Sequence, residues 1–209
     1  MPSDISKSVH WHGHSTFRIE TAAKTVIYID PWHISPDNPK ADIVLVTHEH
    51  HDHCSPDDIA RIAKPDTVIA GPAQLKKHLT QKITVLRFGV TETIRDITVE
   101  PVPSYNITKP FHPRANGNMG YIITFDGVRL YHAGDTDLIP EMENLRADIA
   151  LLPVGGTYTM NPAEAALAAG LIKPSAAVPM HCGKHVGSYE MAADFAKLTP
   201  RAVILKEEK

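Results

Sequence analysis

Short apolar runs alternate with turn signals along the chain, and this pattern predicts strands and short helices. Residues 41–47 are apolar and rich in β-branched side chains, which predicts a buried strand. Farther on, Ser55 suits a helix cap, Pro56 fits the first helical position, and Asp58 stands three residues past the cap. A helix is therefore expected from Pro56 to about Ala63.

The pattern occurs twice, which indicates an internal duplication. Residues 41–47 parallel residues 147–153, and residues 64–70 parallel residues 173–179 in the same order. Each copy predicts a hairpin followed by a strand, a helix and a further strand. The other predicted elements are hairpin strands at residues 16–20, 25–29, 120–125 and 128–131, a turn at Asp126-Gly127, and a helix over residues 162–171 capped by Asn161 and Glu164.

Two such units are expected to pack sheet against sheet with helices outside, as one α/β domain over residues 1–209. We place the halves at about residues 9–103 and 119–209, joined by a loop over residues 104–118. This loop holds two prolines and three asparagines and has little periodicity. Long loops in compact domains are often functional, so it is either a lid over a substrate or a solvated connector.

Composition narrows the classes of partner. The 209 residues suffice for one domain with a substantial core, and 43% apolar and 22% charged residues are ordinary for a globular protein. A net charge of −3 gives no basic field for nucleic acid or a membrane surface. The N-terminus lacks a signal-peptide pattern, and no apolar run is long enough to span a bilayer. We expect a cytoplasmic protein with a small-molecule substrate, with a homo-oligomer left open.

The segment from Thr47 to His53, with the sequence Thr-His-Glu-His-His-Asp-His, carries the clearest chemistry. It lies between the predicted strand and helix, where side chains can converge. The spacing predicts that His48 and His50 reach one ion while Asp52 and His53 reach a second. Imidazole with carboxylate suits Zn²⁺, Mn²⁺ or Fe better than Ca²⁺ or Mg²⁺. The alternative is a polar loop without a metal.

This segment resembles the hallmark motif of the metallo-β-lactamase superfamily of metal-dependent hydrolases. The resemblance spans about residues 9 to 187 and is closest to the small single-domain branch that contains ascorbate-6-phosphate lactonase-like proteins. It implies a four-layer αβ/βα sandwich with two divalent metal ions, Zn²⁺ first and Mn²⁺ or Fe as alternatives, between the halves. It also implies that Asp135 bridges the ions and that His181 is the last ligand. The matching segments are Gly13-His14-Ser15, Ile29-Asp30-Pro31, Tyr131-His-Ala-Gly-Asp135 and Pro179-Met-His181.

One position departs from that branch, in which a histidine ligand stands where this chain has Asn106. His112 is the only histidine in the same loop. Either His112 completes the site of the first metal, or Asn106 or water fills it and His112 contacts the substrate.

The resemblance implies a hydrolase in which a metal-bound hydroxide, oriented by Asp52, attacks a lactone, ester, thioester or phosphodiester. His185, Tyr158 and a water are candidates for the general acid. Asn106, Arg114 and Lys184 are candidate substrate contacts. A protein of the same fold that binds metal or senses a ligand without catalysis is the alternative.

Other residues of the predicted site carry smaller expectations. His14 and His12 are candidates to approach the metals, and His132 either supports a ligand or packs in the core. His51 is expected to point outward. Cys54 and Cys182 each follow a proposed ligand directly and are interpreted as small buried residues, with metal ligation or a reactive thiol as the alternative. The remaining histidines, His10, His33 and His78, are expected at the surface.

Overall fold

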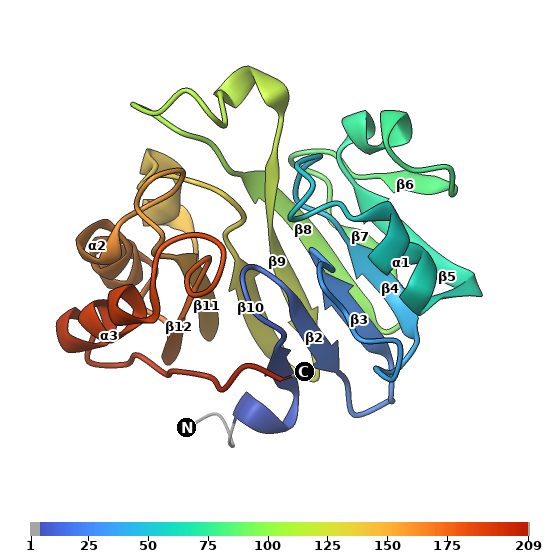
Figure 1. The fold of residues 1–209 in the computed structure, drawn as a ribbon, viewed down its shortest axis with the longest axis horizontal. Coiled ribbons are helices and arrows are strands. Elements are labelled where there is room, and N and C mark those ends of the chain that lie inside the picture. The colour runs from blue at the N-terminus through green and yellow to red at the C-terminus, as the bar shows by residue number, and fades with distance from the viewer. Residues whose placement is uncertain (1–4, 209) are drawn as a thin grey trace.

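The computed structural model describes residues 5–208, whose strands form two six-stranded sheets (Figure 1). The strands of the first sheet follow chain order: β1 (Val9–Trp11), β2 (Phe17–Glu20), β3 (Val26–Ile29), β4 (Ala41–Leu45), β5 (Ala63–Gly71) and β6 (Ile83–Val85). The second sheet has the order β12 (Ala176–Met180), β11 (Ile149–Pro153), β10 (Val128–His132), β9 (Met119–Phe125), β8 (Ile97–Pro103) and β7 (Glu92–Ile94).

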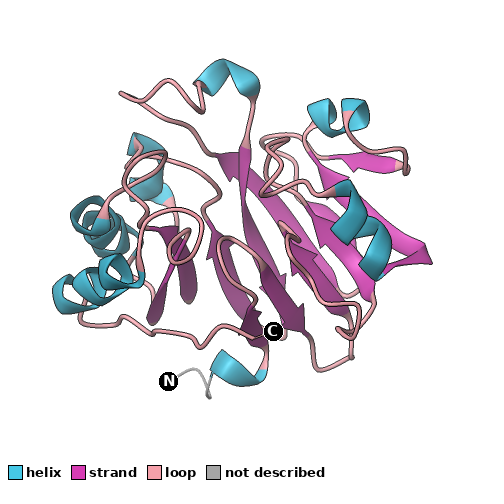
Figure 2. Ribbon diagram, in the orientation of Figure 1, coloured by secondary structure: helices cyan, strands magenta, loops and turns pink. Residues whose placement is uncertain are grey.

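Helices lie on the two outer sides of the strands, as Figure 2 shows. The α-helices are α1 (Pro56–Ile62), α2 (Pro162–Ile172) and α3 (Tyr189–Leu198), and the short 3₁₀ helices are η1 (Ile5–Lys7), η2 (Ala73–Lys77), η3 (Arg114–Asn116) and η4 (Pro140–Asn144). None of the helices in the described residues is long and apolar enough to cross a membrane. This arrangement confirms the predicted α/β sandwich.

The two sheets share one pairing pattern. β2 and β3 are antiparallel and are followed by the parallel strands β4 and β5, and β9 and β10 are likewise antiparallel and followed by the parallel strands β11 and β12. The repeated blocks of the sequence correspond to β4 with β11 and to β5 with β12. The internal symmetry predicted from these blocks is therefore present in the fold.

The boundary between the sheets differs from the predicted halves. Residues 92–103, which we assigned to the first half, form β7 and β8 in the second sheet. β8 pairs antiparallel with β9 from Thr98 opposite Thr124 to Pro103 opposite Met119. The loop over residues 104–118 thus connects two neighbouring strands of one sheet, and the sheets are joined by the segment between β6 and β7.

Successive side chains of a strand point to opposite faces, so the first sheet packs against an apolar layer on each face. Ile43 and Leu45 of β4 belong to the large core that includes residues of both sheets. Val44, between them, faces the opposite way and packs in a second cluster with Ile59 and Ile62 of α1. Because β4 is buried on both faces, its sequence is almost continuously apolar.

The predicted helix starts are confirmed. The Ser55 side chain accepts a hydrogen bond from the backbone N–H of Asp58 and caps α1. Asn161 and Glu164 form a reciprocal capping box at the start of α2. α3 was not predicted from the sequence.

Candidate metal centre

The candidate ligands follow the carboxyl ends of strands from both sheets. Residues 48–53 follow β4, Asp135 lies just after β10, and His181 directly follows β12. His112 lies in the loop between β8 and β9. Because the carboxyl ends of parallel strands share one edge of a sheet, Asp135 and His181 of the second sheet lie close together. Packing of the two sheets brings residues 48–53 of the first sheet to the same place.

Three histidines, His48, His50 and His112, form what we call the first set. Their potential ligand atoms lie within 4.8 Å of one another. The Nδ1 atom of His50 is 3.1 Å from the Nε2 atom of His48 and 3.1 Å from that of His112. His48 Nδ1 lies 3.0 Å from the Thr47 hydroxyl, and His112 Nδ1 lies 3.1 Å from the Asn106 carbonyl oxygen, so both Nδ1 atoms act as donors. Two bare Nε2 lone pairs therefore face one nitrogen of His50, an arrangement that a cation would satisfy.

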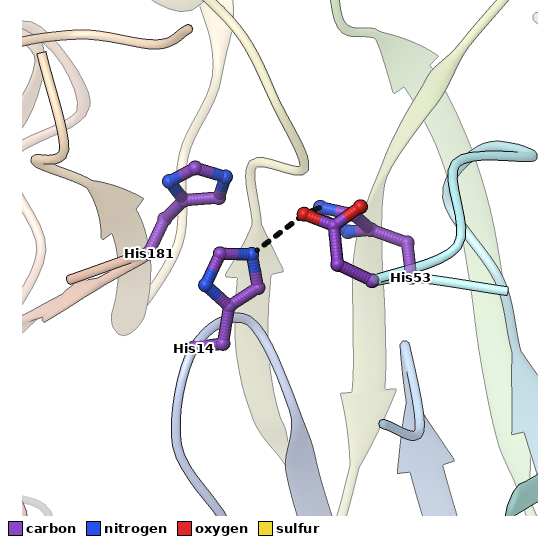
Figure 3. A group of neighbouring side chains, drawn as sticks. His14, His53 and His181 are labelled. Carbon is purple, nitrogen blue, oxygen red and sulfur yellow. Dashed lines mark hydrogen bonds and ion pairs between the residues drawn. The ribbon is translucent and has the colours of Figure 1, made fainter. Parts of the chain in front are cut away.

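The second set consists of His14, Asp52, His53 and His181, whose ligand atoms also lie within 4.8 Å of one another. In Figure 3 the rings of His14, His53 and His181 approach one another from three separate segments. His14 Nε2 lies 3.1 Å from a carboxylate oxygen of Asp52. The Nδ1 of His53 donates to Asp30 across 2.7 Å, which leaves Nε2 free to face the site. This carboxylate–histidine pairing is the usual support of a metal-binding imidazole.

Asp135 lies between the two sets. One of its oxygens is 3.1 Å from His181 Nε2 and 3.4 Å from His112 Nε2. The other is 3.3 Å from His53 Nε2, an ion-pair distance at which neither buried atom completes a well-formed hydrogen bond within residues 5–208. Buried polar atoms are rarely left unpaired. The residues present therefore fit a carboxylate that bridges two cations.

Burial and nearby charges set the protonation of these groups. Burial lowers the pKa of His48 well below its ordinary value and also lowers the pKa of His112, so both rings are neutral and keep their lone pairs. Burial lowers the pKa of His14 to about 4. Burial also opposes a charge on His53, but Asp135 and Asp30 outweigh it and raise its pKa well above the ordinary value.

Asp30 supports both sets and was not assigned a role from the sequence. This carboxylate is fully buried and accepts hydrogen bonds from the Thr47 backbone N–H and hydroxyl, each at 2.7 Å, as well as from His53. Thr47 in turn contacts His48. Its signals in the sequence are an acidic residue directly after a buried strand and the segment Ile29-Asp30-Pro31, which belongs to the family resemblance.

Asn106 lies behind His112 and outside both sets. Its side-chain oxygen accepts from the His112 backbone N–H at 2.9 Å, beside the 3.1 Å contact to Nδ1. Its amide nitrogen donates to Asp137 at 3.1 Å and to the Tyr158 carbonyl at 2.9 Å. The structure thus places His112 among the candidate ligands and Asn106 as the residue that orients it.

Several residues of the centre have unusual backbone conformations. His14, Asp30 and His181 have positive φ angles of 49°, 49° and 54°. This left-handed region is sparsely used by residues other than glycine, and such strain clusters at functional sites. Gly155 packs so closely on His181 that a Cβ atom there would lie 2.5 Å from the His181 carbonyl oxygen.

A cavity of about 480 Å³ opens above the centre. The predicted catalytic residues Asp52 and His185 both line this cavity, and His185 is exposed to solvent. The cavity is lined by His50, Asp52, His112, Asp135 and His181 from the centre and by Trp32, His51, Phe111, Tyr158, His185 and Val186 around them.

Two predicted substrate contacts do not line this cavity. Arg114 forms an ion pair with Glu141 at 2.8 Å, and Lys184 forms one with Glu207 at 2.8 Å. Both cations are therefore already paired on the surface.

The remaining candidates contribute no ligand atom to either set. His132 is buried, and its Nε2 lies 2.9 Å from the Ser15 carbonyl oxygen. Of the two interpretations, support of a ligand or packing in the core, this contact fits packing in the core. His12 lies beside Tyr28 and belongs to neither set. Cys54 and Cys182 are buried, and burial raises their pKa to about 12 and about 11, so neither thiol is reactive at neutral pH.

Comparison with known proteins places this geometry in a family. The model of the β-lactamase superfamily domain matches residues 8–181. A UPF0173 metal-dependent hydrolase of Caldivirga maquilingensis is 35% identical over 90% of this chain and 88% of its own length. One from Koribacter versatilis is 39% identical over 84% of each chain. The crystal structure of a candidate metal-dependent hydrolase from Parabacteroides distasonis superposes with a TM-score of 0.84 and 37% identity, covering 96% of this chain and 93% of the other. The chain therefore belongs to the metallo-β-lactamase superfamily and, within it, to the UPF0173 family of metal-dependent hydrolases.

Proposed function

We propose that this protein is a dinuclear hydrolase that cleaves a lactone, ester, thioester or phosphodiester of a small molecule. The observation that carries the proposal is the position of Asp135 between two sets of buried ligand atoms. A single ion would need only one of these sets.

In this proposal His48, His50 and His112 hold one ion, and Asp52, His53 and His181 hold the other, with Asp135 shared. Mixed imidazole and carboxylate ligands favour Zn²⁺, with Mn²⁺ or Fe as alternatives. Such a pair, when bound, lowers the pKa of a coordinated water and polarises the electrophile.

The chain's own residues would orient the reacting groups. Asp52 lines the cavity, and His14 fixes its carboxylate through a 3.1 Å contact, which suits Asp52 to accept a hydrogen bond from the attacking water. His185 packs on Trp32 with ring centroids 4.5 Å apart and on His33 at 5.0 Å. At the edge of the cavity, His185 is the side chain best placed to protonate a leaving group.

A metal-binding sensor without catalysis remains the second candidate function. The open cavity above Asp52 and Asp135 favours the hydrolase, because a sensor has no need for a reacting molecule to reach the bridging carboxylate.

The proposal predicts two metal ions per chain and turnover that depends on His48. After reloading with zinc or manganese, elemental analysis should give about two ions, and panels of lactones, thioesters and bis-p-nitrophenyl phosphate should include a substrate. His48→Ala should abolish turnover, whereas His78→Ala, an exposed histidine, should not. Two bound ions with no turnover on any panel would favour the sensor, and metal content at trace level would refute both.

Metal binding is expected to release a proton from His53. Because Asp135 and Asp30 keep its pKa well above the ordinary value, this ring is protonated at neutral pH when metal is absent. Coordination requires the bare nitrogen, so protons compete with metal and the apparent affinity should rise with pH until the pKa of His53 is passed. Zinc titration calorimetry in two buffers of different ionisation enthalpy should give at least one proton released per chain at pH 7, from His53, with any further proton coming from the coordinated water. Affinity independent of pH would contradict this prediction.

A further inference from the structure

Two aromatic pairs line the cavity above the candidate metal centre. Phe111 and Tyr158 meet edge to face, with ring centroids 4.6 Å apart and planes at 73°. Trp32 and His185 form the second pair, with centroids 4.5 Å apart. Each pair joins segments that are distant in the sequence, so the fold, and not local order along the chain, brings these rings together.

The rings lie nearer to solvent than the ligands do. Phe111 is 40% exposed and Tyr158 is 36% exposed, whereas His112 and Asp135 of the same cavity are 1% and 3% exposed. The two rings therefore form part of the solvent-facing wall of the cavity that contains Asp135. Exposed aromatic surface in a cavity gains free energy when an apolar group covers it.

Within the described residues, the cavity presents no permanently cationic side chain to a phosphate or carboxylate group, and its basic side chains are all histidines. No lysine or arginine lines it within residues 5–208. The basic residues of the neighbouring loops are already paired: Arg114 with Glu141, Lys184 with Glu207, and Lys109 with Asp137. An anionic group bound away from the metals would lose water without gaining a lysine or arginine partner.

We infer that the substrate of the proposed hydrolase carries a neutral, flat, apolar group, such as an aryl ring, beside the bond that is cleaved. The residues that determine this specificity are Phe111 and Tyr158 of the first aromatic pair and Trp32 of the second. The inference rests on the proposed function and narrows it, because it disfavours phosphorylated sugars and other strongly anionic substrates. The cavity volume of about 480 Å³ accommodates a small molecule of this class.

Matched metal-binding probes test this inference without depending on turnover. Acetohydroxamate and benzohydroxamate share one chelating group and differ in a phenyl ring, and 4-phosphonobenzohydroxamate adds a charge to that ring. On the zinc-loaded protein, followed by tryptophan fluorescence, we expect benzohydroxamate to bind about tenfold more tightly than acetohydroxamate. We expect 4-phosphonobenzohydroxamate to bind no more tightly than benzohydroxamate.

Tyr158→Ala is the decisive variant, because it removes one ring while leaving the backbone carbonyl that Asn106 contacts. It should reduce the tenfold preference to about threefold or less with zinc content unchanged. Leu167→Ala, which removes an apolar side chain that is 61% exposed on α2, should keep the preference. Equal affinities, tighter binding of the phosphonate, or no saturable binding would overturn the inference. If the wild-type protein held no zinc after reloading, in contrast, the proposed function itself would be overturned.

Discussion

Asp135→Asn is expected to abolish hydrolysis while leaving the fold intact. The substitution keeps the shape of the side chain but removes the negative charge that lies between His53, His112 and His181. Without that charge, two cations at the neighbouring sets would repel each other with no anion between them. We expect kcat/KM to fall on the order of 10³-fold or more, and metal content to fall below two ions per chain.

Elemental analysis and steady-state kinetics check this result, with circular dichroism to confirm folding. Asp194→Asn is a suitable control, because Asp194 forms only an exposed ion pair with Lys197 on α3. If Asp135→Asn retained two ions and full turnover, Asp135 would not bridge the metals and the proposed centre would be wrong.

The sequence predicted best what depends on local order. The segment from residue 48 to residue 53 contributes ligands to both sets within one turn, so a metal site can be predicted from it without knowing the fold. The repeated strand blocks gave the internal symmetry for the same reason, because each block is a continuous apolar run. Asp135 and His181 were identified only through the family resemblance, since nothing local to either residue marks it as a metal ligand.

Features that depend on tertiary contacts could not be predicted. Asp30 supports His53 only because β3 and β4 pair side by side, which brings residue 30 next to residue 47. The close approach of Gly155 to His181 depends on the pairing of β11 with β12. Arg114 looked available for substrate because its ion-pair partner, Glu141, lies 27 residues away in the sequence.

The predicted halves failed for a related reason. The long loop over residues 104–118 looked like a linker because it lacks periodicity. In the structure it joins β8 to β9 within one sheet. It also carries Phe111 and His112 to the cavity, so the loop is part of the candidate site. Length and composition identify a functional loop, but strand pairing decides which elements it connects.

His112→Ala and Asn106→Ala should weaken metal binding to different degrees. His112 presents its Nε2 atom 3.1 Å from His50 and 3.4 Å from Asp135, so its removal should empty the first set's site. Asn106 binds the far nitrogen and the backbone of His112 and ties them to Asp137 and the Tyr158 carbonyl, so its loss leaves the ring present but poorly oriented. Loss of such a supporting contact weakens metal affinity by about 10- to 100-fold.

Competition with a chromogenic zinc chelator measures both affinities, and Asn144→Ala, an exposed asparagine in η4, serves as the matched control. In excess zinc, Asn106→Ala should regain both ions and most of its turnover, because the ligand itself is still present. His112→Ala should regain neither its full metal content nor its activity. If instead the asparagine variant lost metal while the histidine variant kept both ions, Asn106 would be the ligand, and His112 would belong to the substrate side of the cavity.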